Sequence, residues 1–263
     1  MNTTQDLRFA VLIDADNVPY SNVKGMLEEI AKYGTPTYKR IYGDWTRPTV
    51  SGWKGVLLEN AITPIQQYSY TSGKNSSDSA LIIDAMDILY SGKVDGFCIV
   101  SSDSDFTRLA TRLREEGMKV IGMGQKKTPQ PFITACDKFI YIEILPGSAD
   151  SKKIAAKKTV KASKDEKPPE QQIEATEEKE TLSTVDSKLI RVIRNSINDL
   201  ADETGWAFLG DLGNLILKKQ PDFDARNYGF PKMLPLIKSI DSFMVDERET
   251  GKSNVKHVFV KNK

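Results

Sequence analysis

The first half of the chain alternates between short apolar runs and stretches in which apolar residues recur at helical spacing. An apolar run of about five residues suits a strand buried on both faces, and strand–helix alternation favours parallel strands joined by right-handed crossovers. The pattern therefore predicts an α/β domain built as a doubly wound parallel sheet. Strands are expected at 9–13, 37–43, 62–68, 96–100, 119–124 and 138–144, and helices at 22–33, 51–60, 77–91, 105–116 and 129–136.

Residues 184–263 follow a different pattern, in which helical spacing comes first and two apolar strands come last. In "VDSKLIRVIRNSINDLADE" apolar residues recur at helical spacing from Leu189 to Leu200, and "WAFLGDLGNLILKK" repeats that spacing. The segments "FMVDE" and "VKHVFV" flank the turn "RETGKSN", which predicts a hairpin. Helices followed by a hairpin over about 80 residues predict a winged-helix-like α+β domain.

Between these two parts lies a stretch rich in Lys, Glu, Ser and Ala, which contains Pro168 and Pro169 and has no aromatic residue. Residues 148–183 carry 8 basic and 8 acidic side chains, so the segment is highly charged and has little apolar surface to bury. We therefore expect a disordered charged linker over 148–183, which separates a domain at 1–147 from a domain at 184–263.

The overall composition narrows the class of protein. A formal net charge of +1 over 263 residues gives no global sign of nucleic-acid binding, although a local basic patch is compatible with it. No stretch reaches the roughly 20 apolar residues that span a bilayer, and no secretory signal is recognised, so we expect a cytoplasmic protein without a membrane partner. Cys98 and Cys136 form no CxxC arrangement, which favours buried reduced thiols. His257 is the only histidine, which argues against chemistry that needs a histidine base.

Carboxylates follow two of the predicted strands at the point where the apolar run stops. "FAVLIDADN" ends on Asp14 and Asp16, and "IVSSDSDF" ends on Asp103 and Asp105. In a doubly wound sheet, ligands bind beyond the carboxyl ends of the strands, where both acidic groups would project. In "KNSSDSALIIDAMDILYSG", Asp78 falls in the first turn of the expected helix, on the face that packs against the sheet. These acids are therefore expected to converge on one pocket.

Two further acids on that helix lie outside the sheet-facing stripe of apolar residues. On a helical wheel, Asp84 and Asp87 fall well away from the face that Leu81 and Ile82 mark. The wheel therefore predicts that the carboxylates of Asp84 and Asp87 are exposed to solvent and do not belong to the pocket.

Carboxylates packed this closely repel one another and would hold protons unless a cation lay between them. Oxygen ligands suit a hard divalent ion, so the sequence predicts a Mg²⁺ or Mn²⁺ site formed by Asp14, Asp78 and Asp103. Such an ion keeps bound water, activates it and neutralises charge on a phosphoryl group, which allows phosphodiester hydrolysis without a histidine. For Asp16 and Asp105, helix capping or turn formation is the simpler alternative.

Other local patterns carry less information. Asn17 is either a turn residue or an amide that orients substrate or water. Aromatic residues between 38 and 70 are interleaved with basic residues that include Arg40 and Lys74, and such a surface could stack bases and attract phosphates. Half of these aromatic residues are expected to be core. "GMGQKK" and "ETGKSN" each lack a glycine that a nucleotide-binding loop requires.

Three separated segments carry a family resemblance. They are "VLIDADNV", "KNSSDSALIIDAMDILYSG" and "IVSSDSDFTRLATRLREEGMKVIGMG", and in this order and spacing they resemble the NYN domain of the PIN-like nuclease superfamily, in its LabA-like branch. The resemblance covers about residues 8–145 and implies a Rossmann-like PIN fold with metal-dependent RNA cleavage. It places these residues on the active-site positions of the family: Asp14, Asn17, Asp78, Asp103 and Asp105. The family also tends to carry an Asp at the position of Asp84, which conflicts with the helical wheel.

The second half resembles the OST-HTH, or LOTUS, domain through "GWAFLGDLG", "PDFDARNYGF" and the terminal hairpin. That family is a winged helix associated with RNA binding and protein contacts, and similar modules are found beside NYN domains. The resemblance implies that the C-terminal domain binds RNA or a protein partner. The basic residues that we expect to contact an RNA backbone are Lys218, Lys219 and Arg226 in this domain, and Arg40 and Lys74 in the first.

Three functions are compatible with these patterns. The first is a metal-dependent endoribonuclease in RNA processing or regulation, whose C-terminal module binds RNA. The second is a non-catalytic RNA-binding regulatory scaffold that keeps the pocket for a metal or a nucleotide but catalyses no reaction. The third is a phosphatase of the haloacid-dehalogenase type, because "DADNV" matches the first motif of those enzymes, with Asp14 as nucleophile and Asp16 as acid and base.

In the nuclease hypothesis each acid has a defined role. Asp14, Asp78 and Asp103 would hold the metal ions that activate water for attack on a phosphodiester. Asp105 would assist them as a ligand or an orienting group, and Asn17 would position the scissile phosphate.

Overall fold

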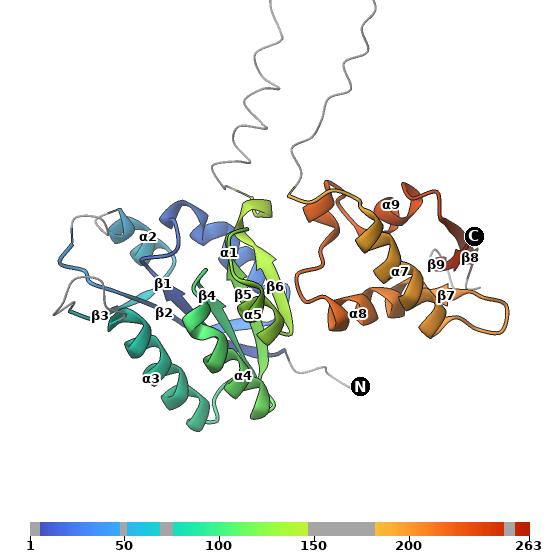
Figure 1. Ribbon diagram of the computed structural model, residues 1–263. Coiled ribbons are helices and arrows are strands. Elements are labelled where there is room, and N and C mark those ends of the chain that lie inside the picture. The colour runs from blue at the N-terminus through green and yellow to red at the C-terminus, as the bar shows by residue number, and fades with distance from the viewer. Residues whose placement is uncertain (1–5, 48–51, 69–75, 147–181, 250–255) are drawn as a thin grey trace, which may run out of the picture.

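The N-terminal part of the chain is built around one parallel sheet, and a smaller α+β part follows it (Figure 1). This computed structural model describes residues 6–47, 52–68, 76–146, 182–249 and 256–263. Lys74 and most of the predicted linker lie outside the described residues. The predicted domain limits at 147 and 184 therefore stay predictions.

Among the described residues, six strands form the N-terminal sheet, and every neighbouring pair is parallel. The strands are β1 (Arg8–Asp14), β2 (Thr35–Gly43), β3 (Thr63–Gln66), β4 (Gly96–Val100), β5 (Lys119–Gly124) and β6 (Lys138–Tyr141). Every residue of β4 is buried, as expected for an apolar run covered on both faces. The order across the sheet is β3–β2–β1–β4–β5–β6, which is the order of a Rossmann-type sheet.

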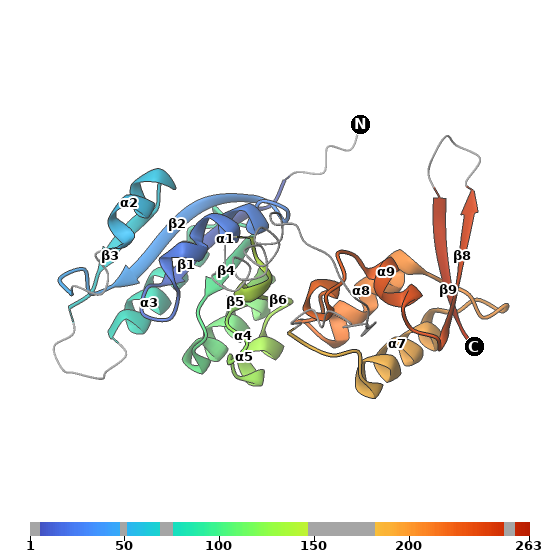
Figure 2. The ribbon, with the colours of Figure 1, turned by 90° about the horizontal axis from the view of Figure 1, so that it is seen from above.

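Helices cover both faces of this sheet (Figure 2). They are α1 (Val23–Ile30), α2 (Trp53–Glu59), α3 (Ser76–Tyr90), α4 (Thr107–Glu115) and α5 (Gln130–Ala135). On one face, Met26 of α1 and Trp53 of α2 share a core with Val11 of β1. On the other face, Leu12 of β1 belongs to the core that α3, α4 and α5 complete, for example through Leu81. Alternate residues of β1 thus face two separate cores, and the predicted α/β doubly wound class is confirmed.

The strand order reverses between β1 and β4. The chain runs outward from β1 to β2 and β3, and it then returns to β4 on the other side of β1. Ile13 pairs with Val100 in register, so β1 and β4 end side by side. A reversal of this kind opens a crevice for ligands at the carboxyl ends of the strands. The acidic loops that follow β1 and β4 therefore meet where the fold favours a binding site.

The C-terminal part packs its helices on a small antiparallel sheet in the order β7–β9–β8. Its elements are α7 (Ser187–Leu200), β7 (Ala207–Phe208), α8 (Leu209–Lys219), α9 (Met233–Lys238), β8 (Phe243–Glu249) and β9 (Lys256–Asn262). Asp186 caps α7 by accepting a hydrogen bond from the backbone N–H of Leu189 at 2.9 Å. Leu189 and Ile193 of α7 share a core with Leu212 of α8 and Val260 of β9. The predicted α+β class of this part is confirmed.

Two predicted strands are longer than the observed ones. The strand expected at 138–144 ends at Tyr141, because residues 142–144 form a 3₁₀ turn. The strand expected at 62–68 is the short edge strand β3, which pairs with β2 only. Apolar residues continue past the end of each ladder, so the apolar pattern alone overestimates strand length.

Two predictions from the composition, buried thiols and the absence of a membrane-spanning segment, can be compared with the structure. Cys98 and Cys136 are both buried free thiols, as predicted. Over the described ranges of the chain, we find no helix whose length and apolar character would let it cross a membrane.

Gly122 on β5 is packed so tightly that a methyl group would collide with the core. A Cβ atom at this position would lie 2.6 Å from Phe139 Cδ2 and 2.7 Å from Cys136 Sγ. We expect Gly122→Ala to lower the free energy of unfolding by about 1–3 kcal/mol, because an overpacked core must displace its neighbours. Gly55→Ala is the matched control, since nothing lies within 4 Å of its Cβ position and Ala favours the helix α2. Urea unfolding measures both, and equal stability of the two variants would contradict this packing.

Candidate metal centre

The candidate site lies where the loops after β1 and β4 approach the first turn of α3. Asp14 is the last residue of β1, Asp103 follows shortly after β4, and Asp78 lies in the first turn of α3. Each apolar run stops at this edge, where the sheet ends and polar side chains pair with one another. Parallel strands end at the same edge, so acids from segments far apart in sequence come together.

Asp14 is the buried acid of the site, with 1% of its surface exposed. Its Oδ2 accepts hydrogen bonds from Asn17 Nδ2 at 2.7 Å and from Ser101 Oγ at 2.8 Å. Its Oδ1 accepts a hydrogen bond from the backbone N–H of Asp16 at 3.0 Å. Burial raises the pKa of Asp14, and these hydrogen bonds oppose the rise because they favour the ionised form. Both strand-end loops therefore hold this carboxylate in one orientation.

Ser101 joins the two strand-end loops, although the sequence pattern predicts no role for it. It is fully buried, and its Oγ donates to Asp14 and accepts from the backbone N–H of Asp103 at 3.1 Å. Asp103 in turn accepts the backbone N–H of Asp105 at 3.0 Å and caps a 3₁₀ turn at Ser104–Phe106. The available signal was a hydroxyl placed directly after a fully apolar strand, since a buried hydroxyl needs a partner.

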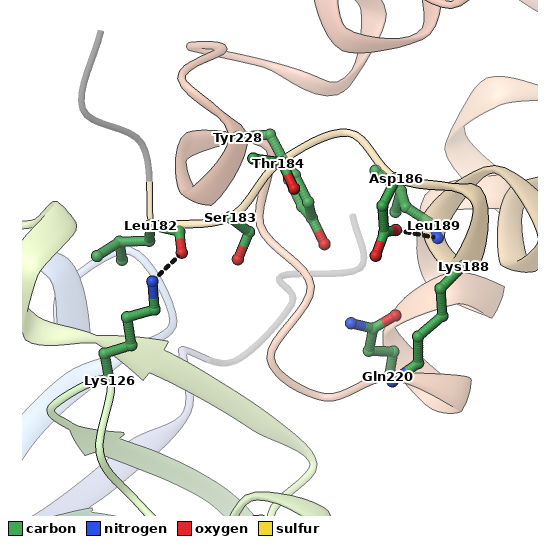
Figure 3. A pocket seen from close by; sticks show the side chains of 9 residues that line it. All are labelled: Lys126, Leu182, Ser183, Thr184, Asp186, Lys188, Leu189, Gln220 and Tyr228. Atoms are coloured by element: carbon green, nitrogen blue, oxygen red, sulfur yellow. Dashed lines mark hydrogen bonds between the residues drawn. The ribbon is translucent and has the colours of Figure 1, made fainter.

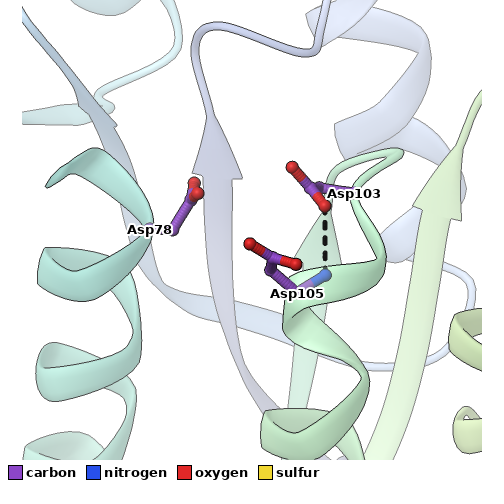
Figure 4. A group of neighbouring side chains, drawn as sticks. All are labelled: Asp78, Asp103 and Asp105. Carbon is purple, nitrogen blue, oxygen red and sulfur yellow. Dashed lines mark hydrogen bonds between the residues drawn. The ribbon is translucent and has the colours of Figure 1, made fainter. Parts of the chain in front are cut away.

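Asp78, Asp103 and Asp105 form the group of acids within the described residues that could share a metal ion (Figure 4). One carboxylate oxygen from each lies within 4.8 Å of the others. Asp78 reaches the group from α3, whereas Asp103 and Asp105 come from the segment that joins β4 to α4. Asp78 and Asp103 are half-buried, and Asp105 is exposed. Asp14 is not one of these three, but it lies near enough for its charge to act on Asp78.

The charges gathered here make ionisation of Asp78 costly. Burial, followed by the charges of Asp14, Asp103 and Asp105, raises the pKa of Asp78 to about 6. A divalent cation between these carboxylates would remove the repulsion. A proton and a cation therefore compete for Asp78.

The donor set fits Mg²⁺ or Mn²⁺. Each of the three side chains offers a carboxylate oxygen, the ligand that hard divalent ions prefer. Oxygens bound to one Mg²⁺ at about 2.1 Å lie about 3–4 Å apart, so a spread of up to 4.8 Å closes with small side-chain shifts. Mg²⁺ also keeps several of its waters, and three protein ligands leave positions for them. The residues that would hold the ion are Asp78, Asp103 and Asp105.

Asp16 and Asn17 complete the loop after β1. The Asp16 side chain is exposed, and its backbone N–H binds Asp14. Asn17 is half-buried and donates one amide N–H to Asp14. This geometry disfavours a phosphatase in which Asp14 is the nucleophile, because a carboxylate that is 1% exposed and accepts three hydrogen bonds cannot reach a phosphoryl group.

The prediction that Asp84 is exposed to solvent is wrong. Its carboxylate accepts hydrogen bonds from Arg40 Nη1 and Tyr42 Oη on β2, and its side chain is 20% exposed. Because α3 contacts both β1 and β2, Asp84 faces Arg40 and Tyr42 on β2 although it lies outside the apolar face of the helix. Asp87 is exposed, as predicted. Asp84 is thus tied to β2 and is not one of the three grouped acids.

The basic and aromatic residues of the N-terminal part divide between surface and core. Arg40 is paired with the acid on α3, and its guanidinium lies over the Tyr38 ring, 5.2 Å from the centroid. Tyr42 and Trp53 are buried in the core, whereas Tyr68 is exposed. The expectation that part of this aromatic set is core is therefore confirmed.

The three basic residues predicted to contact RNA in the C-terminal part have different surroundings. Lys218 is exposed in the last turn of α8. Lys219 is paired with Asp199 at 2.6 Å. Arg226 is half-buried and paired with Asp224 and Glu29, so its guanidinium is already engaged.

We expect Ser101→Ala to lower the free energy of unfolding by about 1–3 kcal/mol, because Asp14 and the backbone N–H of Asp103 both lose a buried partner. Ser104→Ala in the same loop is the control, since that side chain is exposed, and it should change stability by less than about 0.5 kcal/mol. Urea unfolding compares the two variants. If Ser101→Ala proves as stable as Ser104→Ala, the proposed support of the acids fails.

Proton release from Asp78 should govern how cation binding depends on pH. We expect the affinity for Mn²⁺ to rise with pH up to about pH 6 and to change little above it, because below that pKa a proton occupies Asp78. Without metal the sign reverses: the raised pKa means that the proton stabilises the folded state, so stability falls as pH rises from about 4 to about 6. Calorimetric titration with Mn²⁺ across this range measures the affinity. A flat profile, or an identical profile for Asp78→Asn, would argue against the assignment.

Comparisons with known proteins bear on both parts of the chain. The profile of the NYN domain matches residues 8–143, and that of the OST-HTH/LOTUS domain matches residues 180–255. A comparison with curated proteins finds no match. Similar solved structures include a crystal structure of a protein of unknown function from Vibrio parahaemolyticus, which is 21% identical, covers 54% of this chain and 96% of its own, and has a TM-score of 0.46.

A solution NMR structure of an uncharacterized protein from Nitrosomonas europaea is also similar. It is 31% identical over 38% of this chain and 92% of its own, with a TM-score of 0.29. The two profiles occur in the order that the sequence resemblance predicts, and the first spans half of the chain, including all the predicted site acids. NYN domains are part of the PIN-like nuclease superfamily, and an OST-HTH domain implies RNA binding. The chain therefore belongs to the NYN domain family and carries an OST-HTH/LOTUS domain after its NYN domain.

Proposed function

We propose that this chain is a metal-dependent endoribonuclease in RNA processing or regulation, and that its C-terminal part binds the RNA. The observation that carries the proposal is the convergence of Asp78, Asp103 and Asp105 at the switch point of a NYN-domain sheet. Acids so close repel one another unless a cation joins them. A divalent cation held by carboxylates is also what hydrolysis of a phosphodiester without a histidine requires. The OST-HTH profile supports RNA as the substrate.

When bound, Mg²⁺ or Mn²⁺ supplies a water of lowered pKa and neutralises the charge that develops on the phosphoryl oxygens. Asp78, Asp103 and Asp105 would hold this ion through their carboxylate oxygens. Asp78 would do so in its ionised form, which a nearby positive charge favours. Asp105 is the exposed member of the group, so its side of the site faces the solvent from which a phosphodiester approaches.

Asp14 supports these three acids from the buried side. Its negative charge adds to the attraction for a cation, as its effect on the pKa of Asp78 indicates. It also holds Asn17 Nδ2 at 2.7 Å, which leaves the second N–H of that amide to donate to a phosphate oxygen. Asn17 thus positions the scissile phosphate, and Ser101 keeps Asp14 and the loop of Asp103 in register.

The C-terminal part supplies affinity for RNA in this proposal. Lys218 is exposed in the last turn of α8, where an ammonium group can neutralise a backbone phosphate. A binding module joined to a nuclease raises the effective concentration of substrate at the cleavage site. The catalytic part therefore needs little RNA affinity of its own, which is consistent with its net charge near zero over 1–147, from 16 basic and 17 acidic residues.

Cleavage of end-labelled single-stranded RNA in Mn²⁺ or Mg²⁺ tests the proposal. We expect Asp78→Asn, Asp103→Asn and Asp105→Asn each to slow cleavage by at least about 100-fold, because each removes a charged ligand. Asp14→Asn should slow it by about 10- to 100-fold, since this residue supports the ligands. Asp87→Asn is the control, because Asp87 is an exposed acid on the same helix as Asp78, and its rate should equal that of the wild type.

The same assay separates the alternatives. Cleavage should stop in EDTA, and a DNA strand of the same sequence shows whether the 2′-hydroxyl is recognised. Wild-type rates in Asp78→Asn and Asp103→Asn would contradict the assigned site. Tight RNA binding without metal-dependent cleavage would instead favour the non-catalytic scaffold.

A further inference from the structure

Residues 221–226, which we call the docking segment, join the C-terminal part to the N-terminal sheet. The backbone N–H of Phe139 on β6 donates to the carbonyl oxygen of Pro221 at 2.8 Å. Tyr141 Oη, at the end of β6, donates to Asp222 Oδ2 at 2.9 Å. β6 is the edge strand of the described sheet, so the docking segment satisfies a backbone donor that an edge leaves unpaired.

The same segment forms a charged contact with α1. Arg226 Nη1 and Nη2 donate to the two carboxylate oxygens of Glu29 at 2.9 and 2.8 Å. Arg226 also donates to both oxygens of Asp224, at 3.0 Å from Nε and 2.7 Å from Nη2. A guanidinium bound by two carboxylates in this forked geometry is fixed in orientation as well as in position.

The Arg226–Glu29 ion pair is much more buried than the exposed pair at Lys238 in the C-terminal part. The side chain of Glu29 is 2% exposed and that of Arg226 is 26% exposed, whereas the Lys238–Glu247 pair is 51% and 35% exposed. Burial raises the pKa of Glu29, but hydrogen bonds from Arg226 and Lys32 outweigh it and lower the pKa to about 2. An ion pair shielded in this way resists screening by salt and is costly to break from one side.

A cavity of about 470 Å³ lies beside this contact, between the two parts (Figure 3). Lys126 lines it from the loop after β5, and its Nζ donates to the carbonyl oxygen of Leu182. Lys188, Gln220 and Tyr228 line it from the C-terminal part. Asp186 also lines the cavity, and its carboxylate accepts the backbone N–H of Leu189. Two ammonium groups, an amide and a phenol suit the phosphates and sugar hydroxyls of a nucleic-acid backbone.

This cavity is connected to the candidate metal centre through the loop after β5. The backbone N–H of Gln125 donates to Ser102 Oγ at 2.9 Å, and Ser102 directly precedes Asp103. Lys126 follows Gln125, so it leaves the sheet at the same carboxyl edge as the acids. Lys126 thus lines the cavity from the edge of the sheet at which the acids lie.

We propose that Arg226 and Glu29 clamp the two parts into one body, which makes the cavity between them a fixed section of the binding face for single-stranded RNA. The role of the cavity rests on the RNA binding in the proposed function, not on cleavage, whereas the clamp rests on neither. Arg226 is a positioning residue here, since its guanidinium is occupied by Glu29 and Asp224 and does not touch RNA. This role replaces the expectation that Arg226 contacts an RNA backbone.

Amide hydrogen exchange on the full-length chain tests the clamp. We expect Arg226→Gln and Glu29→Gln each to speed exchange of the Phe139 amide by at least about tenfold, because its partner Pro221 then leaves β6. The double variant should match the single variants at Phe139, since each of the three lacks the Arg226–Glu29 ion pair. Lys238→Gln is the matched control, because it removes an exposed ion pair within the C-terminal part. Unchanged exchange in β1 shows that each variant is folded.

Binding of a fluorescently labelled single-stranded RNA, measured by anisotropy in EDTA so that no cleavage occurs, tests the cavity. Lys188→Gln should weaken binding by about threefold or more without changing exchange at Phe139, because it removes one phosphate contact. Arg226→Gln should weaken binding and also speed that exchange. Lys238→Gln should do neither.

Each result bears on one half of the inference. Wild-type exchange at Phe139 in both Arg226→Gln and Glu29→Gln would overturn the clamp. Wild-type RNA affinity in both Lys188→Gln and Arg226→Gln would overturn the role of the cavity. Failure of the chain to cleave RNA, with the exchange and binding results intact, would refute the nuclease and leave this inference standing.

Discussion

Repulsion among carboxylates is the constraint on which the organisation of the N-terminal domain depends. Asp78, Asp103 and Asp105 approach within the reach of one ion, and the buried Asp14 lies beside them. Without a cation this arrangement is unfavourable: burial, together with the charges of the neighbouring acids, raises the pKa of Asp78 to about 6. The free energy that keeps these acids together comes from elsewhere, namely from strands buried on both faces and from hydrogen bonds through Ser101. Cation binding would relieve the repulsion. The affinity for metal therefore depends on the rigid sheet edge that holds the acids close together.

Much of this arrangement is encoded in local pattern and could be predicted. The apolar runs that end at Asp14 and Val100 specify strands covered on both faces, and strand–helix alternation requires parallel pairing. Parallel pairing alone brings the two acidic loops to one edge. Helical spacing places Asp78 on the sheet-facing side at the start of its helix. For Asp105 the sequence left capping and metal binding as alternatives. In the structure its backbone N–H joins the cap of Asp103 and its carboxylate joins the acidic group.

The features that could not be predicted depend on neighbours far apart in the chain. The helical wheel places Asp84 in solvent because it contains no information about Arg40 and Tyr42 on β2. The role of Ser101 depends on Asp14, which lies 87 positions away. Glu29 and Arg226 are separated by 197 positions in the sequence. Because both are charged, the sequence alone predicts that each lies on the surface. The periodicity of apolar residues indicates which face of a helix or strand is buried. It does not identify the side chain on another element that pairs with a polar residue.

The central claim is that a cation held by these acids acts directly on the scissile phosphate of RNA. Replacing one non-bridging oxygen of that phosphate by sulfur tests the claim most directly, because Mg²⁺ binds sulfur poorly and Mn²⁺ accepts it more readily. Our account predicts that the sulfur-substituted RNA is cleaved slowly in Mg²⁺ and that Mn²⁺ restores much of the rate for one of the two sulfur stereoisomers. Equal slowing of both stereoisomers in both metals, or no slowing at all, would contradict it.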